Sequence, residues 1–489
     1  MTLTLENFQA LLPLLITCAT TVFVMLAIAI RRNHWWNATV TVVGLNLALL
    51  SSYFALQAIP QTITPLFVVD GYSIFFGALV LISALGTSTL TNAYIESSKR
   101  NREEIYLLIT IAAAGGIVLT MAHHMASLFI GLEMMSVALY GLVSYTYDRA
   151  RSLEAAIKYM VLSATASAIM LFGIALVYAQ FGTLSFAEIG SKIGQTPSTL
   201  ALVGGILITI GLFFKLSLAP FHLWTPDVYE GAPAPIGAFL ATAAKVSVFA
   251  VLVRFAMIET KGAFFVSAPF AMTLFVVACL SMLVGNLLAL KQNNIKRMLG
   301  YSSIAHFGYL FILILVGGGG VGLEGFAVYM AIYVVTSLAA FGVVTLMSAG
   351  NAKRDADLLN DYRGLFWRRP FLASIFTISL FSLAGIPLTA GFIGKFYVIK
   401  AAVEAGPLAW IALIFVVLGS AIGIYFYLRT IISLYLAKKD MFRFDAQMDW
   451  GQHAGGIMVL GSALFILVIG IWPTPLINLV EMASMIWQQ

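Results

Sequence analysis

The amino-acid sequence predicts an all-α polytopic membrane protein, and three observations support this fold class. Of the 489 residues, 61% are hydrophobic, and the mean hydropathy is +0.97. Only 10% are charged, whereas a soluble domain carries roughly 25%. The apolar residues also gather into runs long enough to cross a membrane. This composition excludes a soluble enzyme, a disordered protein and a nucleic-acid binder, because so few charged side chains cannot cover a water-facing surface.

About fourteen of these runs are expected to be transmembrane helices, since a span needs about 20 apolar residues. The predicted spans are 8–30, 36–58, 71–95, 104–122, 125–147, 154–180, 198–220, 232–256, 265–290, 297–317, 324–349, 370–401, 406–437 and 455–479. The first is not a cleavable signal peptide, because it lacks a basic start and a basic pair follows it. No soluble domain is expected, since the longest loop, near 350–369, is too short to hold a core.

The basic residues predict how the chain is oriented. With fourteen spans both termini lie on one side, and 18 basic residues fall in loops on the opposite side, against three on the side of the termini. The larger set is Arg31, Arg32, Lys99, Arg100, Arg102, Arg149, Arg151, Lys291, Lys296, Arg297, Lys353, Arg354, Arg363, Arg368, Arg369, Lys438, Lys439 and Arg443, and the smaller set is Lys192, Lys261 and Lys400. Basic loops favour the cytoplasm, so both termini are expected outside.

The remaining six basic residues lie inside predicted spans, together with one acid. They are Lys158, Lys215, Lys245, Arg254, Lys395 and Arg429, and the acid is Glu133. A charge at mid-membrane costs at least ~2.5–3.5 kcal/mol on insertion scales, so function is the default hypothesis. Arg254 and Arg429 lie near helix ends and are expected to snorkel to the interface. Lys158 has structural anchoring as its alternative, and a buried structural ion pair is the alternative for the rest.

Glu133 and Lys245 are predicted to lie near the membrane midplane. Desolvation disfavours the charged form of a lysine, and a neighbouring glutamate favours it. A Glu–Lys pair in such a place can therefore act as a titratable switch. A row of such groups is what a proton relay requires.

Two spans carry a proline where a helix is expected to be intact. Pro220 follows Lys215, and Pro387 precedes Lys395. Proline removes a backbone hydrogen bond, and a pair of broken helices in matching halves points to a transport site. A simple structural kink is the alternative for either proline alone.

The halves also match in sequence, and this predicts an internal repeat. Leu153-Glu154 and Tyr159-Met160 recur as Leu323-Glu324 and Tyr329-Met330, and Ser167 recurs as Ser337. Each copy covers five helices, so the second copy is inverted. The predicted division is an N-terminal part of three helices (1–103), two inverted half-channel units (104–256 and 265–437) and a C-terminal helix (438–489). The charges are not repeated, because Glu133 matches roughly Ser302.

Two histidines are further candidates for handling protons. His222 follows the first proline and His306 lies inside the tenth span; histidine titrates near pH 6.5, although a hydrogen-bonded packing histidine is an equal alternative. Asp227 and Glu230 are expected to collect protons, contact a neighbour or shape a loop. No Rossmann, P-loop or metal-ligand pattern is present, so any redox chemistry must belong to another chain.

Three segments carry a resemblance that covers essentially the whole chain. KLSLAPFHLWTPDVYEGAPAP (215–235), NIKRMLGYSSIAHFGY (294–309) and LAGIPLTAGFIGKF (383–396) are similar to the antiporter-like subunits of respiratory complex I. The VYEGAP segment and a lysine at position 395 resemble the subunit N branch rather than the L and M branches. Length and loops favour a bacterial protein.

The resemblance implies proton pumping driven by electron transfer from NADH to quinone. No cofactor is implied in this chain, while NADH, FMN, iron–sulfur clusters and quinone would act in other subunits. Implied partners are lipid, the antiporter-like subunit M, the small subunits K and J and the lateral helix of subunit L, in a bacterial inner membrane with both termini periplasmic. The implied relay consists of Glu133, Lys215, Lys245 and Lys395, with less defined roles for Lys158, His222 and His306.

Two other functions stay open at this point. A cation/proton antiporter subunit with no redox partner would have the same fold and similar buried charges. A structural subunit that only joins its neighbours would have no use for four buried charges near matched helix breaks.

Overall fold

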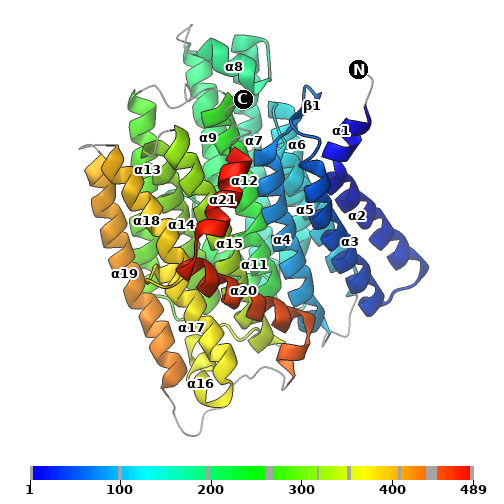
Figure 1. Ribbon diagram of the computed structural model, residues 1–489, viewed down its shortest axis with the longest axis vertical. Coiled ribbons are helices and arrows are strands. Elements are labelled where there is room, and N and C mark those ends of the chain that lie inside the picture. The colour runs from blue at the N-terminus through cyan, green and yellow to red at the C-terminus, as the bar shows by residue number, and fades with distance from the viewer. Residues whose placement is uncertain are drawn as a thin grey trace.

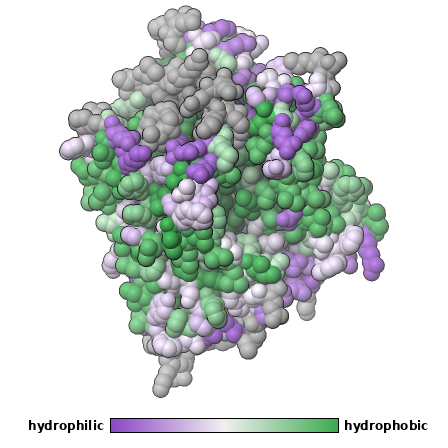
Figure 2. Space-filling view, in the orientation of Figure 1, coloured by the Kyte–Doolittle hydropathy of each residue, from purple (hydrophilic) through white to green (hydrophobic). Residues whose placement is uncertain are grey.

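The computed structural model describes residues 4–96, 102–193, 198–259, 268–316, 319–349, 354–405, 409–436 and 449–484. These residues form a bundle of long helices that run side by side (Figure 1). Apolar side chains surround the middle of the bundle, and hydrophilic ones gather toward its two ends (Figure 2). Within the described residues the only sheet is an antiparallel hairpin of β1 (Gln61–Thr64) and β2 (Phe67–Val69).

The helices follow the predicted order. The N-terminal helices are α1 (Leu5–Ala10), α2 (Leu12–Ile30), α3 (His34–Ala55) and α4 (Gly71–Ile95). The next helices are α5 (Glu104–Thr120), α6 (Met125–Val143), α7 (Ala150–Phe181), α8 (Phe186–Ile193), α9 (Thr199–Leu216), α10 (Trp224–Gly231), α11 (Ala234–Ala241) and α12 (Ala243–Val253), followed by a π-helical turn (Arg254–Glu259). Then come α13 (Ala268–Leu290), α14 (Ile295–Val316), α15 (Gly319–Ser348), a 3-10 turn (Leu359–Tyr362), α16 (Leu365–Arg368), α17 (Pro370–Ala384), α18 (Ala390–Glu404) and α19 (Trp410–Tyr435). A 3-10 turn (Trp450–Gln452), α20 (Ala454–Ile471) and α21 (Thr474–Ser484) complete the described chain.

Twelve helical segments of the described chain are long and apolar enough to cross a membrane, and α5 and α17 are shorter apolar helices. Each of the predicted spans coincides with one of these segments, so the polytopic all-α fold is confirmed. The core is formed by the segments Ala234–Ala256 and Gly322–Ser348, whose apolar stretches are 94% buried. By contrast, only 22% of the stretch in Leu12–Ile30 is buried, as expected of a helix that faces lipid.

The two ends of the bundle differ in the elements that they carry. Figure 1 shows both chain termini toward the end that holds α8 and β1, while α16 lies at the opposite end. We call the α16 end the basic face, because the loops with most of the basic residues meet there. Among the predicted orientation residues, Lys99, Arg100, Lys261, Lys353, Lys438, Lys439 and Arg443 lie outside the described residues.

Both predicted helix breaks are present. Helix α9 ends at Leu216, and the next residue, Ser217, has a φ of +62°. Helix α17 ends at Ala384, and Gly385 has a φ of +79°. A left-handed residue ends a helix and turns the chain away from its axis. After each break the chain resumes as a second helix, α10 or α18, so each broken span has two halves.

The expectation that Arg254 snorkels to the interface is wrong. Its side chain is 1% exposed and forms a two-pronged ion pair with Asp70, with Nη2 2.7 Å from Oδ1 and Nη1 2.9 Å from Oδ2. Asp70 is also the residue that caps α4, since its carboxylate accepts from the backbone N–H of Ser73. Arg429 donates to the backbone carbonyls of Leu290 and Gln292 beyond α13, so it does reach a helix end.

Candidate proton-relay site

The first predicted pair is formed where α9 breaks. Lys215 lies in the last turn of α9, and its Nζ is 4.0 Å from Oε1 of Glu133 on α6. The same Nζ donates to the hydroxyls of Ser136 and Ser163 at 2.7 and 2.6 Å. Ser167 donates to the Glu133 carboxylate at 2.5 Å. Hydroxyls both donate and accept hydrogen bonds, so these serines give the pair a neutral setting through which a proton can pass.

The break is stabilised by aromatic residues of α10. Trp224 donates from Nε1 at 2.9 Å to the backbone carbonyl of Phe214 in the last turn of α9, and this carbonyl also accepts from the backbone N–H of Ser217. Its ring also stacks on Tyr159, with centroids 4.8 Å apart. Lys215 is therefore not needed as a cap for its own helix, and its ammonium points toward Glu133 and the serines.

Lys245 lies near the start of α12 and is 1% exposed. Its Nζ donates to the hydroxyl of Ser303 on α14. The ring centroids of Phe307 and Tyr229 lie 4.9 and 5.8 Å from the same nitrogen. No carboxylate among the described residues forms an ion pair with Lys245. A buried ammonium with only neutral partners is costly, which suits a group that gains and loses a proton.

Lys395 lies in α18, just after the second break. Its Nζ donates at 2.7 Å to the carbonyl of Ala384, the last residue of α17. The C-terminal end of a helix carries a partial negative charge, so the break itself supplies the partner of this lysine. The ring of Tyr309 also lies 5.3 Å from Nζ. A Cβ added at Gly385 would lie 2.5 Å from Cδ of Lys395, so the lysine occupies the space that glycine leaves.

His306 lies on α14 in the region between these two lysines, and both act on it electrostatically. Its Nδ1 is 2.9 Å from the hydroxyl of Tyr329 and its Nε2 is 3.4 Å from that of Tyr427. Tyr427 is in turn hydrogen-bonded to Ser302. The sequence did not predict these tyrosine and serine partners, because a hydroxyl inside an apolar helix carries no pattern of its own.

The other two predicted residues lie apart from this row. Lys158 has a side chain that is 42% exposed, and its Nζ binds Glu154 at 2.7 Å and Asp227 at 2.8 Å. Arg297 on α14 binds Asp227 as well, so Lys158 belongs to a charged cluster between α7, α10 and α14. His222 lies in the turn between α9 and α10, and no hydrogen bond joins it to the relay residues.

A buried carboxylate that the sequence did not predict joins the two halves at the basic face. Asp355 lies between α15 and α16 and accepts from Lys296 at 2.7 Å, from Arg149 at 2.7 Å and from Tyr94 at 2.6 Å. These partners come from α14, from the residue before α7 and from α4. Burial by itself raises the pKa of Asp355, but Lys296 and Arg149 outweigh burial and lower the pKa to about 2. The carboxylate therefore stays charged.

Comparison with known proteins decides the family. The family model for the transmembrane part of NADH:quinone oxidoreductase and Mrp antiporter subunits matches residues 122–423. NADH-quinone oxidoreductase subunit N of Ectopseudomonas mendocina (strain ymp) is 54% identical over 488 residues, which cover 99% of this chain and 98% of that protein. The chain belongs to the subunit N family. The resemblance of the three quoted segments is thereby confirmed.

Solved structures share the fold of this chain. A chain of respiratory complex I from Thermus thermophilus matches with a TM-score of 0.81 and 32% identity, covering 95% of this chain and 98% of that one. A chain of the Mrp complex from Dietzia sp. DQ12-45-1b matches with a TM-score of 0.84 at 20% identity, covering 99% and 98%. The second likeness shows a shared fold alone.

Proposed function

We propose that this chain is a membrane-arm subunit of a proton-translocating NADH:quinone oxidoreductase and takes part in moving protons across the membrane. The 54% identity to a subunit N over nearly the whole chain supports this function. NADH, FMN, the iron–sulfur clusters and quinone would act in other subunits. The rival function, a cation/proton antiporter without a redox partner, has in its favour a likeness of fold and a family model that also covers Mrp antiporter subunits.

The relay consists of Glu133, Lys215, Lys245 and Lys395, with His306 between the last two. One observation carries this proposal: three buried lysines have hydroxyl or carbonyl partners, and within the described residues only Lys215 has a carboxylate within 4.0 Å. A change in the Glu133–Lys215 separation would alter the charge that Lys245 experiences. Lys245 would then gain or release a proton, and Lys395 would exchange protons with one side. Lys158 and His222 would act at the edge of this path.

The setting is a bacterial inner membrane, with the basic face in the cytoplasm and both termini in the periplasm. Subunits M, K and J, the lateral helix of subunit L and lipid would cover the outside of the bundle. The units 104–256 and 265–437 would act as two half-channels, flanked by 1–103 and 438–489. The 18 to three distribution of basic residues between the loops supports this orientation.

Replacement of the central lysine tests the proposal. Lys245→Ala should abolish or sharply reduce coupled NADH oxidation and proton uptake in inside-out membrane vesicles, while the complex still assembles on native gels. Lys192→Ala on α8 is the matched control. Lys192 lies at the end of the bundle opposite the basic face, and its partner within the described residues is the backbone carbonyl of Phe181. A Lys245→Ala complex that pumps the normal number of protons per NADH would refute the role of the relay.

A further inference from the structure

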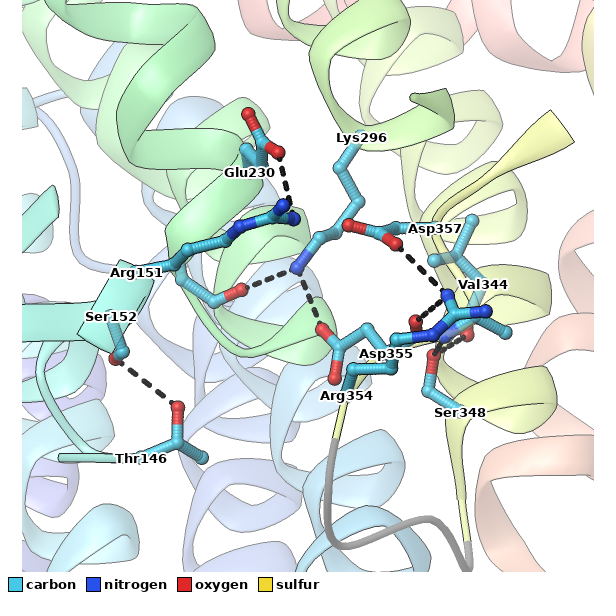
Figure 3. Close-up of polar contacts among 12 residues, drawn as sticks. Thr146, Arg151, Ser152, Glu230, Lys296, Val344, Ser348, Arg354, Asp355 and Asp357 are labelled. Carbon is cyan, nitrogen blue, oxygen red and sulfur yellow. Dashed lines mark hydrogen bonds and ion pairs between the residues drawn. The ribbon is translucent and has the colours of Figure 1, made fainter. Parts of the chain in front are cut away.

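A water-accessible bay opens at the basic face next to the relay. Its volume is about 620 Å³, and most of its lining is charged. Figure 3 shows the charged side chains meeting across it, from α7, α10, α14 and the segment before α16. The lining residues are Asp148, Arg149, Ala150, Arg151, Ser152, Glu230, Gly231, Lys296, Arg354, Asp355 and Asp357.

Most charges that line the bay already form ion pairs. Arg151 binds Glu230 at 3.1 Å, and Lys296 binds Asp355 at 2.7 Å (Figure 3). Arg354 binds Asp361 at 2.9 Å. A binding site for an anion or a cation needs an excess of one sign, and this lining has none. The bay is therefore suited to hold water rather than a charged ligand.

One face of α14 leads from the bay to the central lysine. Lys296, Gly300 and Ser303 are spaced by four and three residues, so they lie on one side of the helix. Lys296 lines the bay, and Ser303 accepts the hydrogen bond of Lys245. Gly300 lies between them, and the gap that its missing side chain leaves is occupied by the ring of Tyr229.

Tyr229 of α10 faces this gap. A Cβ built on Gly300 would meet the Tyr229 ring at 3.4 Å, and the centroid of that ring lies 5.8 Å from Nζ of Lys245. Tyr229 is fully buried, and its hydroxyl lies beside that of Ser303, which accepts the hydrogen bond of Lys245. A hydroxyl beside a second hydroxyl can pass a proton, because each of them both donates and accepts hydrogen bonds.

We infer that the Tyr229 hydroxyl is the relay group through which Lys245 exchanges protons with the bay, along a water-filled seam between α10 and α14. The phenol donates its proton toward Ser303 and the neutral amine of Lys245, and it takes one proton back from water on the bay side. Tyr229 is neutral before and after each transfer, and the net result is one proton moved from the bay to Lys245. This inference rests on the proposed function, because it assumes that Lys245 titrates.

The first experiment removes only the hydroxyl. Tyr229→Phe keeps the ring on Gly300 but should lower coupled NADH oxidation and proton uptake by roughly 100-fold or more, as expected when a proton-transfer group is lost. Tyr301→Phe is the matched control, because Tyr301 is a buried tyrosine on α14 next to Gly300, and it should change little. Normal proton uptake in Tyr229→Phe would overturn the role of the hydroxyl.

The second experiment tests the seam without using activity. Gly300→Cys should react with a small charged thiol reagent added to inside-out vesicles and should be protected in right-side-out vesicles. The wild-type complex, with Cys18 and Cys279, gives the background. No labelling from the basic side in an assembled complex would overturn the seam. Lys245→Ala separates the two proposals: if it stops pumping while these variants behave as wild type, the relay stands and only the entry path fails.

Discussion

The two broken helices have the same outline but hold their lysines in opposite ways. In the first, Lys215 precedes the break and lies 4.0 Å from the carboxylate of Glu133. In the second, Lys395 follows the break and donates at 2.7 Å to the carbonyl of Ala384. At the first break the carbonyl of Phe214 accepts from Trp224 and from the backbone N–H of Ser217 rather than from the lysine. The lysine of the first break therefore has a carboxylate nearby, whereas the lysine of the second break binds the helix end itself.

This difference indicates that the two units share a shape but place their lysines in different electrostatic surroundings. A lysine opposite a carboxylate responds to any movement that lengthens the pair, because the Coulomb energy falls with distance. A lysine bound to the end of a helix has a partner that cannot be neutralised by a proton. In the proposed relay, the first unit would sense a change, and the second would hold a proton and release it.

We expect the largest effect on stability when the carboxylate of Asp355, which joins the two units, is removed. Asp355→Ala leaves Lys296 and Arg149 buried without their shared carboxylate, which should cost about 3–5 kcal/mol. We expect much less intact complex on native gels and a lower melting temperature of the detergent-solubilised complex. Asp357→Asn is the control, because that carboxylate has only a direct bond from Asn294 and a longer contact of 3.5 Å to Arg354.

The ion pairs of Asp355 with Lys296 and Arg149 also lead to a prediction about pH. The pKa of Asp355 is lowered to about 2 from 3.8, so its contribution to stability is present above pH 3.8 and is lost as the pH falls through 2. The contribution of the Asp355 ion pairs to the free energy of unfolding should therefore not vary between pH 5 and 8. Burial raises the pKa of Asp357, so its deprotonation is opposed in the folded state. Any loss of stability as the pH rises from 4 to 6 should disappear in Asp357→Asn and persist in Asp355→Asn.

The next largest effect should arise at Gly385. Gly385→Ala puts a Cβ at a φ of +79° and 2.5 Å from the Lys395 side chain, so the lysine must leave the end of α17. Coupled turnover should fall by roughly 100-fold, toward the value of Lys395→Ala. Ser217, at the first break, already carries a side chain at a φ of +62°. Ser217→Ala should therefore keep most of the turnover, and equal losses in both variants would show that the breaks are equivalent.

The sequence predicted the charges and the breaks but not the partners. Charged residues in apolar runs and prolines at matching places are visible without coordinates, so Glu133, Lys215, Lys245 and Lys395 could be named. The bond from Lys395 to a backbone carbonyl could not, because a free carbonyl appears only once the helix end is placed. The burial of Arg254 could not be predicted for a related reason. Its partner Asp70 lies 184 residues away, and no local pattern connects the two.

A smaller effect is expected when the carboxylate of the first unit is made neutral. Glu133→Gln keeps the size of the side chain and an oxygen that can accept from Ser167. Lys215 would then have only hydroxyl groups as polar partners, like Lys245 in the wild-type protein. Coupled turnover should fall about fivefold, which corresponds to roughly 1 kcal/mol in the barrier. Lys215→Ala, measured in the same vesicles, should fall further. If both variants were equally inactive, the first unit would depend on its carboxylate as strongly as on its lysine.

The smallest effect is expected at the far end of the second unit. Glu324 of α15 accepts a hydrogen bond of 2.6 Å from Tyr397 of α18, and its counterpart in the repeat, Glu154, binds Lys158 on α7. Tyr397→Phe removes one partly buried hydrogen bond and should lower thermal stability by about 1 kcal/mol, with turnover changed less than about twofold. Lys158→Ala should act similarly, because Arg297 still binds Asp227. If Tyr397→Phe instead stopped proton release at the end that holds the termini, Glu324 would serve the second unit as Glu133 serves the first. Each broken helix would then have both a lysine and an acid. The two would differ in how far the acid lies from the lysine and not in the kind of partner.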